Sequence, residues 1–107
     1  MELRSVISGI EGLKARGNLD IEIETIETDS RKVIKNAMFV AIVGFETDGH
    51  KYIKQAIDNG ASAIMIQEGA EINKSDITDD VTVIMAPDTR IATSKMACNF
   101  YRSYMPF

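Results

Sequence analysis

The chain has 107 residues, of which 45% are hydrophobic and 26% charged, and its formal net charge is −4. These values are typical of one small soluble domain with a buried core. The acidic balance argues against a nucleic-acid surface, which needs a basic face. The single cysteine, Cys98, excludes an internal disulfide, and no apolar run is long enough to span a membrane. We therefore expect a cytoplasmic protein that binds neither nucleic acid nor membrane.

The N-terminal part of the chain is predicted to contain one helix and one strand. Apolar residues recur at helical spacing over residues 2–15, and a Gly-Asn pair at residues 17–18 is typical of a helix end. Residues 20–26 alternate isoleucine with acidic or polar residues, which predicts a half-buried strand. The Asp-Ser pair at residues 29–30 then indicates a turn, since both side chains can accept hydrogen bonds from nearby backbone amides.

A strand–helix–strand unit is predicted in the middle of the chain. Residues 38–43 are a continuous apolar run, which predicts a buried central strand. A helix follows, capped by Asp48 or Thr47 and ended by Gly60, which stands where a left-handed residue is favoured. Residues 62–67 form a second apolar strand, so we expect a parallel, right-handed crossover.

The last part of the chain is predicted to hold one more strand and one more helix. Residues 68–80 are polar and acidic and are expected on the surface, whereas residues 81–86 form a buried strand. A Pro-Asp pair at residues 87–88 opens a helix whose apolar face comprises Ala92, Met96, Phe100 and Tyr104. The predicted fold class is α/β, a small mixed, partly parallel sheet flanked by helices. We expect residues 1–107 to form one domain, and a fragment of a longer protein, because the chain stops on a helix end.

Signatures of catalysis are scarce in this sequence. It has neither a G-x-x-x-x-G-K-[ST] phosphate loop nor a G-x-G-x-x-G fingerprint. One histidine and one cysteine cannot supply the usual ligands of a zinc site, and no nucleophile elbow is present. We therefore expect no catalytic residue and no metal site in the chain.

Two polar stretches remain as candidates for ligand binding: T-D-S-R at residues 28–31 and G-F-E-T-D-G-H at residues 44–50. Each follows a predicted strand, and ligands of open α/β sheets tend to lie beyond strand ends. Spacing alone leaves a second interpretation open, and favours it: the first stretch is an Asx turn, and the second is a loop that caps a helix.

Several short motifs, taken in order, resemble the N-terminal domain of the Mur ligases. They are D-S-R-x-V (29–33), M-F-V-A-I-V-G (38–44), D-G-H-x-Y-I (48–53), A-I-x-x-G-A (56–61) and F-Y (100–101). The resemblance is closest to the MurE type, the UDP-N-acetylmuramoyl-dipeptide ligases. Two positions depart from the family pattern. Asn36 replaces a glycine, although asparagine also tolerates a left-handed backbone, and four residues separate F-Y from Pro106.

The resemblance implies a role in peptidoglycan biosynthesis, and so in cell wall biogenesis, cell shape and cell division. Members of this family use ATP and magnesium to add an amino acid to UDP-N-acetylmuramoyl-L-alanyl-D-glutamate. This chain resembles only the domain that binds the uridine nucleotide of that substrate, so we expect no cofactor in it and no activity from it alone. ATP and magnesium are expected in a central domain that this domain contacts. The implied substrate-binding residues are Thr28, Ser30, Phe45, Glu46 and Thr47.

The remaining polar candidates have structural interpretations. Arg31 is expected to pair with Asp29 or Asp48 rather than with phosphate, and His50 is expected to be structural. Three alternative functions stay open: a MurF-type ligase domain, which shares the D-S-R and D-G-H-like motifs, a stand-alone nucleotide-sugar binding module, and an unrelated α/β interaction domain. The F-Y pair near the end of the chain favours the MurE type over the MurF type.

Overall fold

A single five-stranded sheet organises the chain in the computed structural model, which describes residues 1–44 and 47–102. The strand order is β1-β5-β4-β3-β2, with β2 to β5 parallel and β1 antiparallel to β5. The strands are β1 (Lys14–Arg16), β2 (Ile26–Glu27), β3 (Met38–Val40), β4 (Ala63–Gln67) and β5 (Thr82–Ala86). This mixed, partly parallel sheet confirms the predicted fold class.

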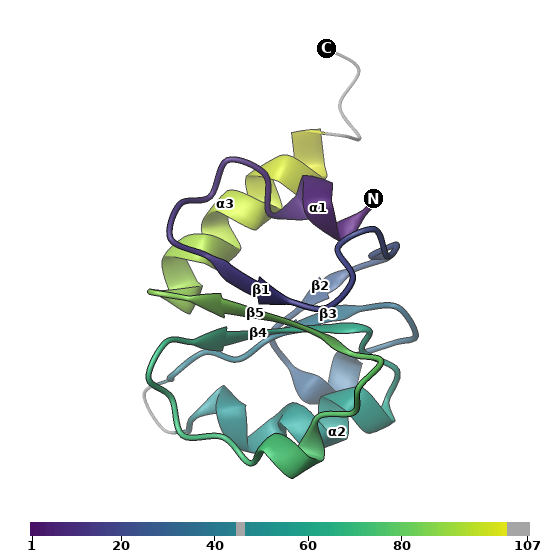
Figure 1. Ribbon diagram of the computed structural model, residues 1–107, viewed down its shortest axis with the longest axis vertical. Helices are drawn as coiled ribbons and strands as arrows, with labels where there is room; N and C mark the ends of the chain where they lie inside the picture. The colour runs from purple at the N-terminus through teal and green to yellow at the C-terminus, as the bar shows by residue number, and fades with distance from the viewer. Residues whose placement is uncertain (45–46, 103–107) are drawn as a thin grey trace.

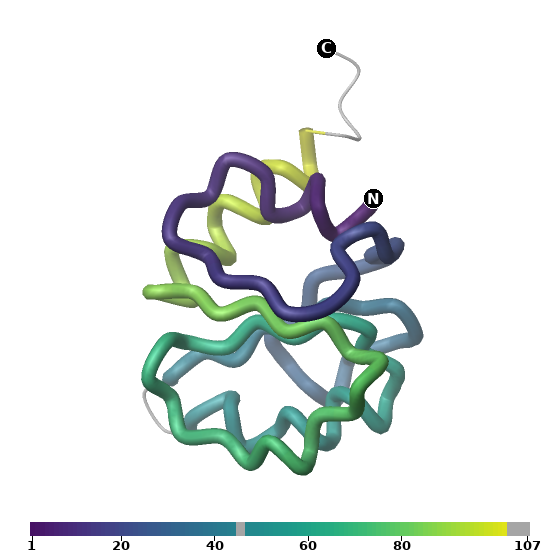
Figure 2. The backbone as a smooth tube through the Cα atoms, in the orientation of Figure 1, coloured from purple at the N-terminus to yellow at the C-terminus, as the bar shows by residue number. Residues whose placement is uncertain are grey.

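Helices cover both faces of the sheet. The short helix α1 (Leu3–Val6) and the long helix α3 (Thr89–Arg102) lie on one face, and α2 (Ile53–Asp58) lies on the other (Figure 1). The backbone trace places the N-terminal segment beside α3 above the sheet (Figure 2). The described residues also form three short 3-10 helices: η1 (Ser30–Lys32), η2 (Gly49–Tyr52) and η3 (Lys74–Asp76). Within the described residues, no helix is long and apolar enough to cross a membrane.

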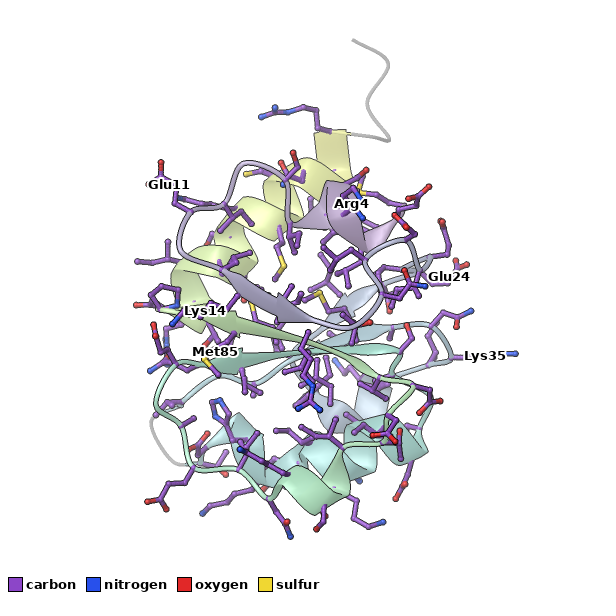
Figure 3. All side chains as sticks on the ribbon, in the orientation of Figure 1. Arg4, Glu11, Lys14, Glu24, Lys35 and Met85 are labelled. Atoms are coloured by element: carbon purple, nitrogen blue, oxygen red, sulfur yellow. The ribbon has the colours of Figure 1, made fainter. Side chains whose placement is uncertain are left out.

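The core is divided by the sheet into two layers. Side chains alternate along β3, so Met38 and Val40 pack with α1 and α3, whereas Phe39 packs with α2. All three are fully buried, which confirms the prediction for Phe39. Ile42, which falls within the buried strand predicted over residues 38–43, is only half-buried and lies beyond the end of β3. Charged side chains such as Glu24 and Lys35 project from the rim of the molecule into solvent (Figure 3).

The predicted N-terminal helix over residues 2–15 is wrong beyond its first turn. Helix α1 ends at Val6, and Gly9 and Gly12 follow with positive φ angles of 76° and 80°, a conformation that interrupts a right-handed helix. Lys14–Arg16 instead forms the antiparallel edge strand β1. The apolar spacing still marks core-facing residues, since Ile7, Ile10 and Leu13 pack against the core, but they do so from a turn and irregular backbone.

The predicted strand over residues 20–26 is mostly irregular. Only Ile26 belongs to β2, which continues to Glu27. Ile23 is nevertheless fully buried, and Glu22 makes an isolated bridge with Glu2. The alternation of isoleucine and glutamate therefore recorded which side chains face the core, but not a continuous strand.

The middle of the chain follows the prediction closely. Strands β3 and β4 are parallel and are connected through α2, whose first turn is the 3-10 helix capped by Asp48. Gly60 has φ +115°, and a Cβ atom there would lie 2.7 Å from the Cα of Lys35, so the turn requires glycine. Asn36 takes the left-handed conformation expected for it, with φ 66°. In α3, Ala92 and Met96 are buried as predicted, whereas Tyr104 lies outside the described residues.

Candidate functional site

Similar turns follow three parallel strands at one edge of the sheet. Because β2 to β5 are parallel, their carboxyl ends lie at the same edge. Beyond β2, β3 and β5, an aspartate begins the next helix: Asp29, Asp48 and Asp88. In each turn the aspartate Oδ1 accepts a hydrogen bond from the backbone N–H two residues later, at 3.0, 3.0 and 2.9 Å respectively. We call residues 28–31, 43–44, 47–50 and 88–90 the carboxyl edge.

The first turn is fastened to α2 through Ser30. The Ser30 hydroxyl is buried and donates to Gln55 Oε1 at 2.6 Å, while Asn59 Nδ2 donates to the Ser30 carbonyl at 2.9 Å. Its one proton is therefore engaged within the protein, and only its oxygen lone pairs remain for another donor. Thr28, by contrast, is exposed to solvent. Of the two predicted substrate-binding residues in this turn, Thr28 lies at the surface and Ser30 is buried below the surface.

Asp29 and Arg31 form the ion pair that the sequence predicted. Arg31 Nε and Nη2 donate to the two Asp29 carboxylate oxygens at 3.0 and 2.9 Å. Hydrogen bonds from the Arg31 side chain and then from its backbone amide lower the pKa of Asp29 from 3.8 to about 2. The Arg31 side chain remains 80% exposed, so the pair is a surface feature.

The loop beyond β3 is closed by its own backbone. Val43 and Asp48 form an isolated antiparallel bridge, and the Gly44 N–H donates to the Thr47 carbonyl at 2.8 Å. Thr47 is exposed, and its hydroxyl lies 3.4 Å from the Tyr52 hydroxyl. The predicted residues Phe45 and Glu46 lie outside the described residues.

Gly49 allows this loop to return to the sheet. Its N–H donates to the Ile42 carbonyl at 2.8 Å, and a Cβ atom at this position would lie 2.8 Å from the Ile42 nitrogen. That distance is too short for any side chain, so glycine is required by the close approach of two backbones.

His50 connects this loop to β4. Its side chain is only 2% exposed, and Nε2 accepts a hydrogen bond from the Gln67 N–H at 3.0 Å. Nδ1 therefore carries the proton and donates to Asp48 Oδ1 at 2.6 Å. Partial desolvation acts to raise the pKa of Asp48, but hydrogen bonds from the His50 amide and ring outweigh it and lower that pKa. The interpretation of His50 as a structural residue is confirmed.

The structure places the predicted residues that it describes beyond the carboxyl ends of two neighbouring strands. Thr28 follows β2, Thr47 follows β3, and these neighbouring strands are paired in parallel up to Glu27 and Phe39. Three further residues at or near the edge were missed by sequence reasoning: Tyr52, Gln55 and Arg90. Arg90 Nη2 donates to the Val43 carbonyl at 2.8 Å across 47 residues of sequence. This contact forms only when the chain is folded, so no local sequence pattern predicts it.

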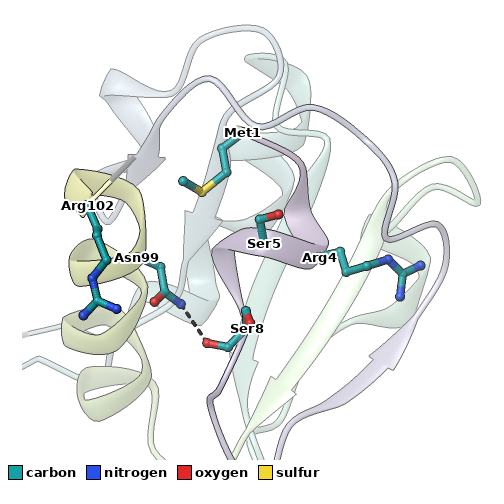
Figure 4. A pocket seen from close by; sticks show the side chains of 6 residues that line it. All are labelled: Met1, Arg4, Ser5, Ser8, Asn99 and Arg102. Carbon is teal, nitrogen blue, oxygen red and sulfur yellow. Dashed lines mark hydrogen bonds between the residues drawn. The ribbon is translucent and has the colours of Figure 1, made fainter. Parts of the chain in front are cut away.

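Two hollows lie elsewhere on the described surface. One, of about 480 Å³, is lined by residues of the first eight positions and of α3, and includes Asn99, whose amide donates to the Ser8 carbonyl at 2.8 Å (Figure 4). The other, of about 570 Å³, lies between β1, the half-buried side chains Val83 and Met85 of β5, and residues 72–81. Neither is lined by a predicted binding residue that the structure describes. Within the described residues, no group of three or more potential metal ligands occurs.

Comparison with known proteins decides the family. Residues 22–101 match the model described as Mur ligase family, catalytic domain. The chain belongs to the Mur ligase family. Similar curated relatives include the UDP-N-acetylmuramoyl-L-alanyl-D-glutamate–2,6-diaminopimelate ligases of Clostridioides difficile and Clostridium tetani. These are 43% and 40% identical over 101 residues, 94% of this chain. The chain spans only 20% of the length of either relative.

Solved structures of Mur ligases share the fold. MurF from Acinetobacter baumannii aligns with a TM-score of 0.59 and 25% identity over 76% of this chain and 16% of that one. MurF from Thermotoga maritima, solved in complex with ADP, aligns with a TM-score of 0.55 and 29% identity over 68% of this chain and 16% of that one. The higher identities belong to the diaminopimelate ligases, so the MurE type fits this Mur ligase chain better than the MurF alternative.

Proposed function

We propose that residues 1–107 are the N-terminal domain of a MurE-type ligase and hold the uridine nucleotide end of UDP-N-acetylmuramoyl-L-alanyl-D-glutamate. The observation that carries this proposal is 43% identity, over 94% of the chain, to a ligase named for that substrate. ATP and magnesium would then act in the remaining four-fifths of the relatives' length, and peptidoglycan synthesis at this stage would place the enzyme in the cytoplasm.

The proposed binding residues are Thr28, Ser30, Phe45, Glu46 and Thr47. Exposed Thr28 and Thr47 offer hydroxyl groups from the ends of two adjacent strands, which suits a ligand that bridges the two turns. Backbone groups of these turns can read the edge of uracil by hydrogen bonds, and amides of the second loop suit a diphosphate. Ser30 supports the site from below, since its hydroxyl already donates to Gln55.

Asp48 limits where the diphosphate can lie. Its carboxylate already accepts a hydrogen bond from the His50 amide at the start of the helix, and its lowered pKa keeps it negatively charged at neutral pH. A phosphate at that amide would meet both a used donor and a like charge. The nucleotide is therefore proposed to contact residues 44–47 rather than the helix terminus.

The contribution of this domain to ligation is to bind and orient the substrate. Anchoring the nucleotide end fixes the position of the distant peptide carboxylate and removes part of its translational and rotational freedom before reaction. Because no phosphate loop occurs in this sequence, the domain alone is expected to release no ADP when supplied with ATP and the UDP-muramoyl dipeptide.

An amide chemical-shift titration with UDP, run in parallel with ATP, tests the proposed site. We expect UDP to shift the amide resonances of residues 27–31 and 44–49. The dissociation constant should be roughly 0.1–1 mM, since only part of the substrate is supplied. ATP should bind far less well, because a uracil-reading edge does not match the donor pattern of adenine.

Threonine variants localise the effect. Thr28→Ala and Thr47→Ala should each weaken UDP binding, whereas Thr78→Ala, an exposed threonine on the 68–80 excursion, should not. An equal response to ATP, shifts centred elsewhere, or no response at several times the expected dissociation constant would each refute the proposed site.

A further inference from the structure

We propose that Arg90 is a positioning residue for the proposed nucleotide-binding loop, which it holds by its hydrogen bond to the Val43 carbonyl. The inference rests on the proposed function, because it assigns a task to a residue that lies beside the binding residues. Arg90 belongs to α3, a different element from either binding stretch.

The three aspartate-capped turns of the carboxyl edge differ in what the basic residue does. Arg31 folds back onto Asp29 of its own turn, and the His50 ring binds Asp48 of its own turn. Arg90 occupies the equivalent position after Asp88, but its guanidinium leaves that turn and reaches Val43 at 2.8 Å. It is the member of this set that links one turn of the edge to another.

The hydrogen bond from Arg90 fastens one end of the binding loop. The other end is fastened at Asp48, which is held by His50, and His50 is held in turn by the Gln67 amide of β4. The proposed contacts at residues 45–47 lie in sequence between these two anchors. A loop fixed at both ends loses less conformational freedom when a ligand binds, which favours binding.

The helix backbone that carries Arg90 is held in place by a cap and by the core. Asp88 accepts hydrogen bonds from the Arg90 and Ile91 amides at 2.9 and 3.2 Å, which fixes the first turn of the 14-residue helix. Ala92 and Met96 bury the inner face of that helix in the core. A charged donor on a carbonyl is also a stronger bond than a neutral one.

The experiment measures UDP affinity and thermal stability for Arg90→Ala, Arg90→Lys and Arg102→Ala. Arg102 is an exposed arginine at the far end of the same helix and is the matched control. We expect Arg90→Ala to weaken UDP binding about five- to tenfold, the equivalent of one hydrogen bond, with little change in the melting midpoint. Arg90→Lys keeps a donor and should fall between Arg90→Ala and the wild type, and Arg102→Ala should bind as the wild type does.

Two further measurements separate positioning from other roles. In the free protein, the amide shifts of Gly44, Thr47 and Gly49 should move in Arg90→Ala but not in Arg102→Ala. Since the bond is made to a neutral carbonyl, the ratio of wild-type to variant affinity should be the same at low and high salt. A ratio that shrinks with salt would mean that Arg90 contacts the phosphates directly, and would overturn the positioning role.

The outcomes are distinguishable from failure of the proposed function. If the wild type binds UDP and Arg90→Ala binds it equally well, the inference is wrong and the proposed function stands. If the wild type does not bind UDP at all, both fail together. If Arg90→Ala loses affinity only in proportion to a lowered melting midpoint, and Arg90→Lys shows no partial recovery, the role of Arg90 is stability alone.

Discussion

The Asp29–Arg31 and Asp48–His50 turns have the same local design but different surroundings. In each, one aspartate caps a 3-10 helix and also binds the side chain two residues later. The Arg31 side chain is 80% exposed, whereas the His50 side chain is 2% exposed and also accepts from the Gln67 amide. We therefore expect burial, rather than the motif itself, to decide whether such a pair stabilises the fold.

The physical reason is the competition with water. An exposed pair exchanges hydrogen bonds with solvent at little net gain, and salt screens its attraction. A buried partner has no water to replace it, so its loss leaves donors and acceptors unsatisfied. The first turn is instead stabilised by Ser30, which is buried beneath its surface pair.

The largest expected effect comes from the core that underlies both turns. Phe39 is fully buried in a cluster with Val33, which follows the first turn, and Ile53, which follows the second. Phe39→Ala should lower the free energy of unfolding by about 3–5 kcal/mol and loosen both turns together. Chemical denaturation measures this. A thermal midpoint within a couple of degrees of the wild type would contradict the assignment of Phe39 to the core.

Removing His50 should break the buried turn selectively. His50→Ala leaves the Gln67 amide without its acceptor and removes the ring donor to Asp48, which keeps only the backbone amide of residue 50; it should cost about 2 kcal/mol of unfolding free energy. Arg31→Ala removes the corresponding side chain of the exposed turn and is the matched control. Its denaturation midpoint should not change measurably. Equal effects of the two substitutions would show that burial does not separate these turns.

Ser30 gives a smaller and more local effect. Ser30→Ala removes the 2.6 Å hydrogen bond to Gln55 and should cost about 1 kcal/mol of unfolding free energy. Hydrogen exchange at the Arg31 and Lys32 amides should become faster in this variant. Ser75→Ala, which removes an exposed hydroxyl bonded to Asn73, provides the control. If Ser30→Ala changes the UDP affinity but not the free energy of unfolding, the hydrogen bond to Gln55 does not stabilise the fold.

The smallest effect is electrostatic and concerns Asp29. Its folded pKa, about 2, lies below its ordinary value of 3.8, so any stabilisation is present above pH 3.8 and disappears as the pH falls through about 2. Arg31→Gln should return the pKa of Asp29 towards its ordinary value. A carbon-detected carboxyl titration measures both values. An unchanged pKa in Arg31→Gln would mean that another group sets it.

The sequence by itself determined the arrangement from β3 onward. Uninterrupted apolar runs identified β4 and β5, Asp48 and Gly60 marked the ends of the helix between β3 and β4, and ordered motifs indicated the family. These features are encoded by residues close together in the chain, since caps, turns and side-chain periodicity depend on near neighbours. The candidate site was predicted from the resemblance that these motifs carry, because spacing alone favoured a turn and a capping loop.

Only the tertiary structure decided the backbone conformation of residues 7–16 and the hydrogen-bond partners of the carboxyl-edge residues. Helical spacing over the first residues was overruled by Gly9 and Gly12 and by pairing of Lys14–Arg16 with β5. The contacts of Gln55 with Ser30, of Gln67 with His50 and of Arg90 with Val43 join residues 25, 17 and 47 positions apart. No periodicity predicts such pairs, because they exist only where packing of the sheet and helices brings distant segments within hydrogen-bonding distance.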